Sequence, residues 1–293
     1  MNDLQQYIDK AAILIEALPY IQAFRGKVLV IKYGGSTMTT EDDVDTVLRD
    51  IVFMASVGMR PVVVHGGGVA ISQRLEQRGI ATRKVNGLRV TDAATMQVVE
   101  DVLFGEVNAA IVQAINGMGG QAVGVSAKES GIMHVTRHQA ESREGSVDIG
   151  FVGDVERVDA APILSLTGQE VIPVIAPIGC GPEGHSYNVN ADTAAGEIAA
   201  ALHAEKLVFL TDVKGIMVDA DNPDTLLSTV RVPEVEALIA DGTIDGGMIP
   251  KVGACLKSVK AGVRKTHIID GRIPHSMLLE FFTNEGIGTE IVQ

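Results

Sequence analysis

The chain alternates between short apolar runs and longer amphipathic segments, which restricts it to folds built on a parallel sheet with helices on both faces. Val28–Ile31 runs into the glycine-rich turn KYGGS at 32–36, and Pro61–Val64 runs into HGGG at 65–68. A helical stretch near 41–57 separates the two runs and can return the chain, so both strands can point the same way. Because ligands in such sheets gather where the strands end, we expect the glycine turns at a binding edge.

The same pattern continues to the end of the chain and predicts an α/β fold. Strands are expected at 27–32, 61–65, 121–126, 171–176, 206–211 and 265–270. Helices are expected at 41–57, 68–79, 92–116, 159–167, 190–203, 233–241, 249–262 and 274–282. Asn86-Gly87 predicts a hairpin at 84–90, a second hairpin is expected around 179–184, and short β pieces are expected within 131–158. A change near 180–190 is consistent with a boundary between two lobes.

Composition excludes several classes of protein. The 293 residues are 46% hydrophobic, enough for a sizeable core, and 24 Lys and Arg stand against 37 Asp and Glu, a net charge of −13. Such a chain is not expected to bind nucleic acid through a basic surface, although a local cationic pocket for an anionic substrate is compatible with it. No stretch approaches the ~20 apolar residues that span a bilayer. The start lacks the layout of a signal peptide, so we expect a cytoplasmic protein with no membrane partner.

Residues 4–22 form an amphipathic pattern ahead of the first strand. The apolar residues near one helical face are Leu4, Tyr7, Ile8, Ala11, Ile15, Leu18, Tyr20 and Ile21. A helix outside the α/β alternation must bury these side chains either on its own domain or on a neighbouring subunit. The sequence leaves both alternatives open.

The glycine turns suit anionic oxygens. Glycine lets backbone N–H groups approach a ligand closely because no Cβ stands in the way, and N–H groups at a helix start attract anions. A third turn, DGGMIPK at 245–251, opens a predicted helix. Lys32 and Lys251 could add positive charge that neutralises a phosphoryl group in transfer. The pattern indicates an enzyme that handles phosphate, although the chain contains no G-x-x-x-x-G-K-[ST] phosphate loop.

Three polar segments are further candidates. Asn190 can cap a helix, which places Asp192 in its first turn, where a carboxylate could also orient the two lysines; spacing supports capping and catalysis equally. Residues 211–215, TDVKG, could bind a nucleotide or form an ordinary turn. Arg89 is suited to bidentate recognition of a carboxylate, although exposed hairpin arginines are common.

Histidine and cysteine do not indicate a metal site. His65 is interpreted as structural rather than as a general base, because phosphoryl transfer to a carboxylate removes no proton from the nucleophile. Cys180 and Cys255 do not have metal-ligand spacing, and we expect no protein ligand to a metal.

Six motifs together resemble the amino acid kinase family over residues 25–293. They are KYGGS at 32–36, HGGG at 65–68, KVNGLRVTD at 84–92, YNVNAD at 187–192, LTDVKGI at 210–216 and GGMIPK at 246–251. The resemblance implies an open, mainly parallel eight-stranded sheet between helical layers. It also implies a lobe at 25–185 that binds an acyl amino acid and dimerises, a lobe at 186–293 that binds ATP, and an extra helix at 1–24.

The reaction implied by this resemblance is in-line transfer from MgATP to the side-chain carboxylate of N-acetyl-L-glutamate, in arginine biosynthesis. Mg²⁺ would be held mainly by phosphates. By position, Lys32 and Lys251 would stabilise the phosphoryl group and Asp192 would organise both lysines. Residues expected to contact the substrate are Gly67, Gly68, Arg89, Asn188 and Asn190. Residues expected to contact the nucleotide are Gly35, Thr211, Asp212, Lys214, Gly215 and Met248.

The helix at 1–24 resembles that of the arginine-sensitive members of the family. In those members it joins dimers into a hexameric ring with arginine bound beside it. The resemblance implies feedback inhibition by L-arginine at His267, Glu280 and Gly286, a homohexamer built as a trimer of dimers, and leaves binding of a PII signalling protein undecided. For the C-terminal segment, the alternative is that it merely completes the fold.

Other functions stay open on the sequence. The chain ends too early for the regulatory domains of aspartate kinases, and those usually read KFGGTS. Glutamate 5-kinase and carbamate kinase are the other rivals within the family, and the Arg89 hairpin and YNVNAD favour the acetylated acceptor. A kinase for carrier-bound or acetylated aminoadipate stays open, because small pocket changes would decide it. A non-catalytic arginine-sensing scaffold is the alternative from another class, against which the intact Lys32, Lys251 and Asp192 argue.

Overall fold

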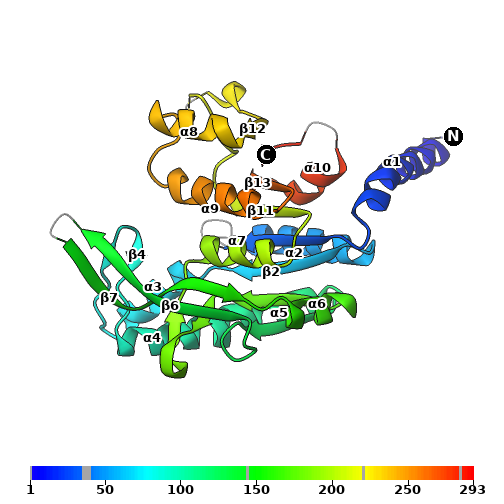
Figure 1. Cartoon of the computed structure of the whole chain (residues 1–293). Helices are drawn as coiled ribbons and strands as arrows, with labels where there is room; N and C mark the ends of the chain where they lie inside the picture. The colour runs from blue at the N-terminus through cyan, green and yellow to red at the C-terminus, as the bar shows by residue number, and fades with distance from the viewer. Residues whose placement is uncertain (1, 35–40, 143–144, 220–221, 284–285) are drawn as a thin grey trace.

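An eight-stranded sheet forms the centre of the molecule (Figure 1). The computed structural model describes residues 2–34, 41–142, 145–219, 222–283 and 286–293. The order across the sheet is β12-β14-β13-β11-β1-β2-β8-β5. The strands are β1 (Val28–Tyr33), β2 (Arg60–His65), β5 (Ala122–Ser126), β8 (Ile172–Ala176), β11 (Lys206–Thr211), β12 (Thr229–Arg231), β13 (Lys265–Asp270) and β14 (Thr289–Val292). All neighbours pair in parallel except β13 and β14, so the expected mainly parallel sheet is confirmed.

Helices cover both faces of this sheet. One face packs on α2 (Glu41–Ser56), α5 (Ala109–Gly117) and α10 (Ser276–Phe282), and the other on α6 (Ala161–Gly168), α7 (Ala191–Ala201), α8 (Val232–Ala240) and α9 (Met248–Lys260). Successive side chains of a strand point to opposite faces, so Leu29 and Ile31 join the first layer and Val30 joins the second. The three-layer arrangement expected from the sequence is therefore present.

The remaining elements lie beside this core. They are α3 (Gly68–Gln77), β3 (Lys84–Val85), β4 (Leu88–Arg89), α4 (Ala93–Glu100), the π-helical segment η2 (Asp101–Asn108), β6 (Met133–Ser142), β7 (Gly145–Val158), β9 (Ile178–Cys180), β10 (Ser186–Asn188), and the short 3₁₀ turns η3 (Pro182–Gly184) and η4 (Pro223–Thr225). Four of these strands close on each other in the order β10-β7-β6-β9. The hairpin expected at Asn86-Gly87 is confirmed, with φ of 50° and 82° at its two central residues.

Three features differ from the expectation. The short β pieces within 131–158 are one long β6–β7 hairpin, which Figure 1 shows extending beyond the body. The single helix expected at 92–116 contains η2, because eight residues of apolar periodicity do not distinguish α from π turns. Strands β12 and β14 were not expected, because runs of only three or four residues carry little periodic pattern.

Helix α1 (Asn2–Phe24) projects away from the body (Figure 1). Among the described residues, its C-terminal end contacts α10, where the Tyr20 and Phe282 rings lie 6.2 Å apart and the Phe24 and Phe281 rings 5.5 Å apart. The exposed apolar side chains of α1 are Leu4, Tyr7, Ile8, Ile13, Leu14, Ile15 and Leu18. A single chain therefore does not bury this surface. None of the helices that the structure describes is long and apolar enough to span a membrane.

Candidate active site

The candidate site lies at the carboxyl edge of the central sheet. Strands β1, β2 and β11 end there, and helices α3, α7 and α9 begin there. Helix N-termini present unpaired N–H groups and a partial positive charge, so this edge favours anions. The edge is the one on which the glycine turns were expected.

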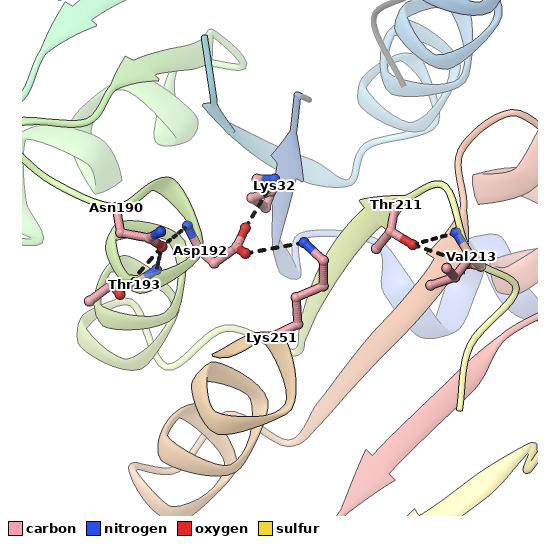
Figure 2. Close-up of polar contacts among 7 residues, drawn as sticks. All are labelled: Lys32, Asn190, Asp192, Thr193, Thr211, Val213 and Lys251. Atoms are coloured by element: carbon pink, nitrogen blue, oxygen red, sulfur yellow. Dashed lines mark hydrogen bonds and ion pairs between the residues drawn. The ribbon is translucent and has the colours of Figure 1, made fainter. Parts of the chain in front are cut away.

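Asp192 joins the two lysines that the sequence singled out. Lys32 Nζ lies 3.0 Å from Asp192 Oδ1, and Lys251 Nζ lies 3.3 Å from Asp192 Oδ2. Figure 2 shows that Lys32 on β1 and Lys251 on α9 both point toward the carboxylate of Asp192, which α7 carries. Each lysine uses one side of a single carboxylate, so the two ammonium groups are held near each other despite their like charge.

Burial and charge act in opposite directions on Asp192. Burial by itself would raise the pKa of its carboxyl, but Lys32 and Lys251 outweigh burial and hold that pKa below its usual range. Asp192 is therefore ionised at neutral pH. The N-cap expected at Asn190 is confirmed, because its Oδ1 accepts from the N–H groups of Asp192 and Thr193 at 2.9 and 3.0 Å.

A cavity of about 230 Å³ opens on one side of Asp192. The predicted substrate residues Gly67, Gly68, Arg89, Asn188 and Asn190 all line it, together with Lys32 and Asp192. Its lining also includes residues that the sequence did not identify as site residues, among them Ile71, Lys84, Gly87, Leu88, Leu103, Val152 and Pro177. Lys84, Gly87 and Leu88 belong to the KVNGLRVTD segment, so their motif was the available signal.

Arg89 is buried in the wall of this cavity rather than exposed on its hairpin. Its guanidinium donates to Thr82 Oγ1 at 3.0 Å, to the Gly68 carbonyl at 3.0 Å and to Ser72 Oγ at 2.8 Å. Burial lowers the pKa of Arg89, and no carboxylate among the described residues pairs with it. A guanidinium fixed by neutral acceptors keeps its charge available for an anionic ligand.

A second cavity, of about 350 Å³, lies on the other side of Lys251. Of the predicted nucleotide residues, Asp212, Gly215 and Met248 line it; Val213, Ile216, Met217, Thr243, Asp245 and Gly247 line it as well. Thr211 and Lys214 do not. Thr211 instead stabilises the turn that follows β11, where its Oγ1 accepts from the Val213 N–H at 2.9 Å. Lys214 is exposed. Gly35 lies outside the described residues.

His65 is buried at the end of β2. Its Nδ1–H donates to the Gly66 carbonyl at 2.9 Å, and its Nε2 accepts from Asn108 Nδ2 at 3.1 Å. Burial lowers the pKa of His65 to about 4, so the ring is neutral at physiological pH. Both observations agree with its interpretation as a structural residue.

The low pKa of His65 predicts a loss of stability in weak acid. A histidine with a pKa of about 4 when folded and about 6.5 when unfolded stabilises the protein above pH 6.5, and this contribution falls as the pH drops toward 4. Between pH 6.5 and pH 5, the loss of this contribution lowers the free energy of unfolding by about 2 kcal/mol. Urea unfolding at both pH values should show a smaller decrease for His65→Gln than for the wild type. Equal decreases in the two proteins would contradict the prediction.

The predicted effector residues His267, Glu280 and Gly286 lie together near the end of α1. His267 Nδ1–H donates to Glu280 Oε1 at 2.7 Å, and Glu280 Oε2 accepts from the N–H of Ile287 at 2.8 Å. Gly286 has a φ of 61°, and a Cβ there would lie 3.0 Å from Glu280 Oε2. Glu280 is thus held by neighbours on β13 and after α10.

Lys206 joins this C-terminal cluster and was not predicted. Its ammonium lies 5.0 Å from the ring centroid of Phe24 on α1 and 4.4 Å from that of Phe281 on α10. Burial lowers the pKa of Lys206 to about 8, although Glu280 opposes that change. The cluster therefore connects α1, the sheet and α10.

The amino acid kinase family model matches residues 27–270, and the chain belongs to that family. The chain is a kinase that transfers a phosphoryl group to a carboxyl group. It is 53% identical over 291 residues to the acetylglutamate kinase of Symbiobacterium thermophilum, with 99% of each chain covered.

Solved structures show the same fold. An N-acetylglutamate synthase from Neisseria gonorrhoeae, complexed with coenzyme A and N-acetyl-glutamate, superposes with a TM-score of 0.82 at 26% identity. That match covers 97% of this chain but only 63% of the synthase. Carbamate kinase from Giardia lamblia bound to AMP-PNP matches with a TM-score of 0.67 at 18% identity, over 92% of this chain and 99% of that one, and supports the fold alone.

Proposed function

We propose that the protein phosphorylates the side-chain carboxylate of N-acetyl-L-glutamate with ATP, as a step of arginine biosynthesis. One observation carries the proposal: Asp192 pairs both with Lys32, which lines the first cavity, and with Lys251, which lines the second. Each cavity can take one anionic reactant, and the two lysines then lie between them. The similarity to acetylglutamate kinases supports the choice of acceptor.

In the proposed mechanism the acceptor occupies the cavity lined by Arg89. Arg89 binds its α-carboxylate, Asn188 contributes a further polar contact, and the side-chain carboxylate points toward Lys32. This carboxylate attacks the γ-phosphorus of ATP in line, the bond to the β–γ bridging oxygen breaks, and an acyl phosphate and ADP result. Lys32 and Lys251 stabilise the charge on the transferred group, and the N–H groups of Gly67 and Gly68 support it.

ATP occupies the cavity at the start of α9 in this proposal. Ile216, Met217 and Met248 supply an apolar wall for the base, and the N-terminus of α9 faces the phosphates. The described residues contain no group of three His, Cys, Asp or Glu that could hold a metal. In this proposal Mg²⁺ would arrive on the phosphate oxygens of ATP with its waters. The residues at 25–185 then form the acceptor lobe and those at 186–293 the nucleotide lobe.

Hydroxylamine trapping tests the proposed reaction. An acyl phosphate reacts with hydroxylamine to give a hydroxamate, so purified protein with N-acetyl-L-glutamate and MgATP should form one. Absence of hydroxamate would overturn the choice of acceptor. Parallel reactions with L-glutamate, L-aspartate and acetylated aminoadipate would then identify the acceptor, and inactivity with all of them would support a sensing scaffold.

We also propose that L-arginine inhibits the enzyme at the C-terminal cluster, in a hexamer that α1 holds together. Glu280 is an anionic group suited to a guanidinium, and it lies in the cluster that contacts Phe24 at the end of α1. The exposed apolar surface of α1 is suited to a second copy of the chain. Arginine binding would then affect how α1 leaves the body.

Deletion of residues 2–22 tests the role of α1. The truncated enzyme should lose the hexameric mass and at least tenfold of its sensitivity to arginine, while retaining most of its kcat, because α1 lies outside both cavities. Light scattering and hydroxamate assays with and without arginine measure the two effects. A truncated enzyme that kept both hexameric mass and arginine inhibition would show that α1 has neither role.

A further inference from the structure

The π-helical segment η2 packs behind the turn Gly66–Gly68. Leu103 and Asn108, both from η2, are almost fully buried; Leu103 contacts Gly67 in this turn, and Asn108 contacts His65, which directly precedes it. In an α-helix two residues five positions apart point about 140° away from each other. Pairing between residues i and i+5 brings such residues onto nearly the same face. The π conformation therefore lets one helix apply both side chains to the turn.

Asn108 holds the turn through His65. Its Nδ2 donates to the Val174 carbonyl on β8 at 2.8 Å and to His65 Nε2 at 3.1 Å. His65 Nδ1–H in turn donates to the Gly66 carbonyl at 2.9 Å. This chain of hydrogen bonds starts on a central strand and ends on the peptide that precedes Gly67, so it determines the orientation of that peptide.

Two glycines make room for the contacts of η2. A Cβ at Gly67 would overlap Leu103 Cδ2, and a Cβ at Gly124 on β5 would overlap Asn108 Oδ1. Gly67 is therefore pressed directly against Leu103, and Gly124 leaves space for the Asn108 amide. Neither glycine has a positive φ, so close approach rather than backbone conformation requires a glycine at both positions.

The held turn also contacts the strand that carries Lys32. The Gly66 N–H donates to the Tyr33 carbonyl at 2.8 Å, and a Cβ at Gly34 would lie 2.6 Å from Gly66 N. A shift of the Gly66 peptide would therefore move the backbone beside Lys32 as well as the N–H groups of Gly67 and Gly68.

We infer that η2 is a positioning element for phosphoryl transfer, in which Asn108 and Leu103 fix the Gly66–Gly68 turn against the reacting groups. The inference rests on the proposed function. Asn108 acts through His65, whereas Leu103 packs against Gly67 and also lines the acceptor cavity; neither side chain carries the chemistry. If the Gly66–Gly68 turn is no longer held in place, stabilisation of the transition state weakens more than substrate binding does. The kcat is therefore the quantity expected to fall most.

Asn108→Leu is the decisive variant, because leucine has a similar size and cannot donate. Its kcat, normalised to folded enzyme, should fall about 10- to 100-fold while the KM for ATP changes less than about threefold. The matched control is Asn116→Leu. Asn116 lies on the same long helix and binds the backbone of Ala122 through its amide, at 3.1 and 2.7 Å, away from the turn. The Asn116→Leu enzyme should retain more than half of the wild-type kcat.

The outcomes separate this inference from the proposed function. Wild-type turnover of N-acetyl-L-glutamate is measured first, and its absence would remove the function itself. With an active wild type, an Asn108→Leu variant whose kcat is unchanged, or falls no more than that of Asn116→Leu, overturns the positioning role. If Asn108→Leu does not fold, Leu103→Val decides. Because Leu103 also lines the acceptor cavity, the KM for N-acetyl-L-glutamate is measured as well. A severalfold lower kcat with unchanged KM for both substrates supports the inference; a wild-type kcat, or a lower kcat accompanied by a higher KM for N-acetyl-L-glutamate, overturns it.

Discussion

Replacing Lys32 with methionine is expected to lower kcat about 10³-fold while the fold stays intact. Methionine keeps the length and the apolar stem of the side chain but removes the ammonium that lies 3.0 Å from Asp192. Asp192 remains paired with Lys251, so the buried carboxylate does not lose its only cation. Hydroxamate formation under saturating substrates measures kcat, and circular dichroism checks the fold.

Lys27→Met is the matched control for this experiment. Lys27 precedes β1, and its half-exposed side chain forms an ion pair with Glu205 at 3.6 Å, outside both cavities. An exposed pair of this kind contributes little, so activity and stability should stay near those of the wild type. A Lys32→Met enzyme as active as Lys27→Met would remove the proposed mechanism.

Replacing Arg89 with methionine is expected to lower kcat/KM for the acceptor about 10³-fold, mainly through a higher KM, with little change in the KM for ATP. The guanidinium is a buried cation in the wall of the proposed acceptor cavity, and its loss would leave the α-carboxylate of the acceptor desolvated and without its partner. Arg89→Lys should not restore the activity, because an ammonium cannot reproduce the fork geometry. Steady-state kinetics with each substrate varied separately measures both constants.

Arg83→Met controls for a change elsewhere near the same hairpin. Arg83 is exposed and does not line the acceptor cavity, although its carbonyl accepts from the Val90 N–H. The kcat/KM of the Arg83→Met enzyme for the acceptor should stay within about twofold of that of the wild type. If Arg89→Met raised the KM for ATP instead of that for the acceptor, the assignment of the two cavities would be wrong.

Features that depend on neighbours in the sequence were predicted correctly. The apolar runs of β1, β2 and β11, the Asn86-Gly87 hairpin and the cap at Asn190 each follow from side-chain shape, glycine conformation or a local hydrogen bond. The glycine turns were placed at the carboxyl edge because strands that alternate with helices run in parallel. These local signals were sufficient for the fold class, whereas the residues expected to contact the substrate followed from the resemblance to the family.

Features that depend on residues distant in the sequence were decided by the tertiary structure. Lys32 and Lys251 meet only because β1 and the start of α9 converge on Asp192. Thr211 and Lys214 belong to the same predicted segment as Asp212 and Gly215 but do not line the second cavity, and Thr211 accepts from the Val213 N–H instead. The apolar periodicity of the sequence likewise predicted neither the π turns of η2 nor the hydrogen-bond partners of Asn108. Local propensity is set by a few neighbouring residues, whereas charge pairing and the direction of a buried side chain are set by which surfaces the completed core brings together.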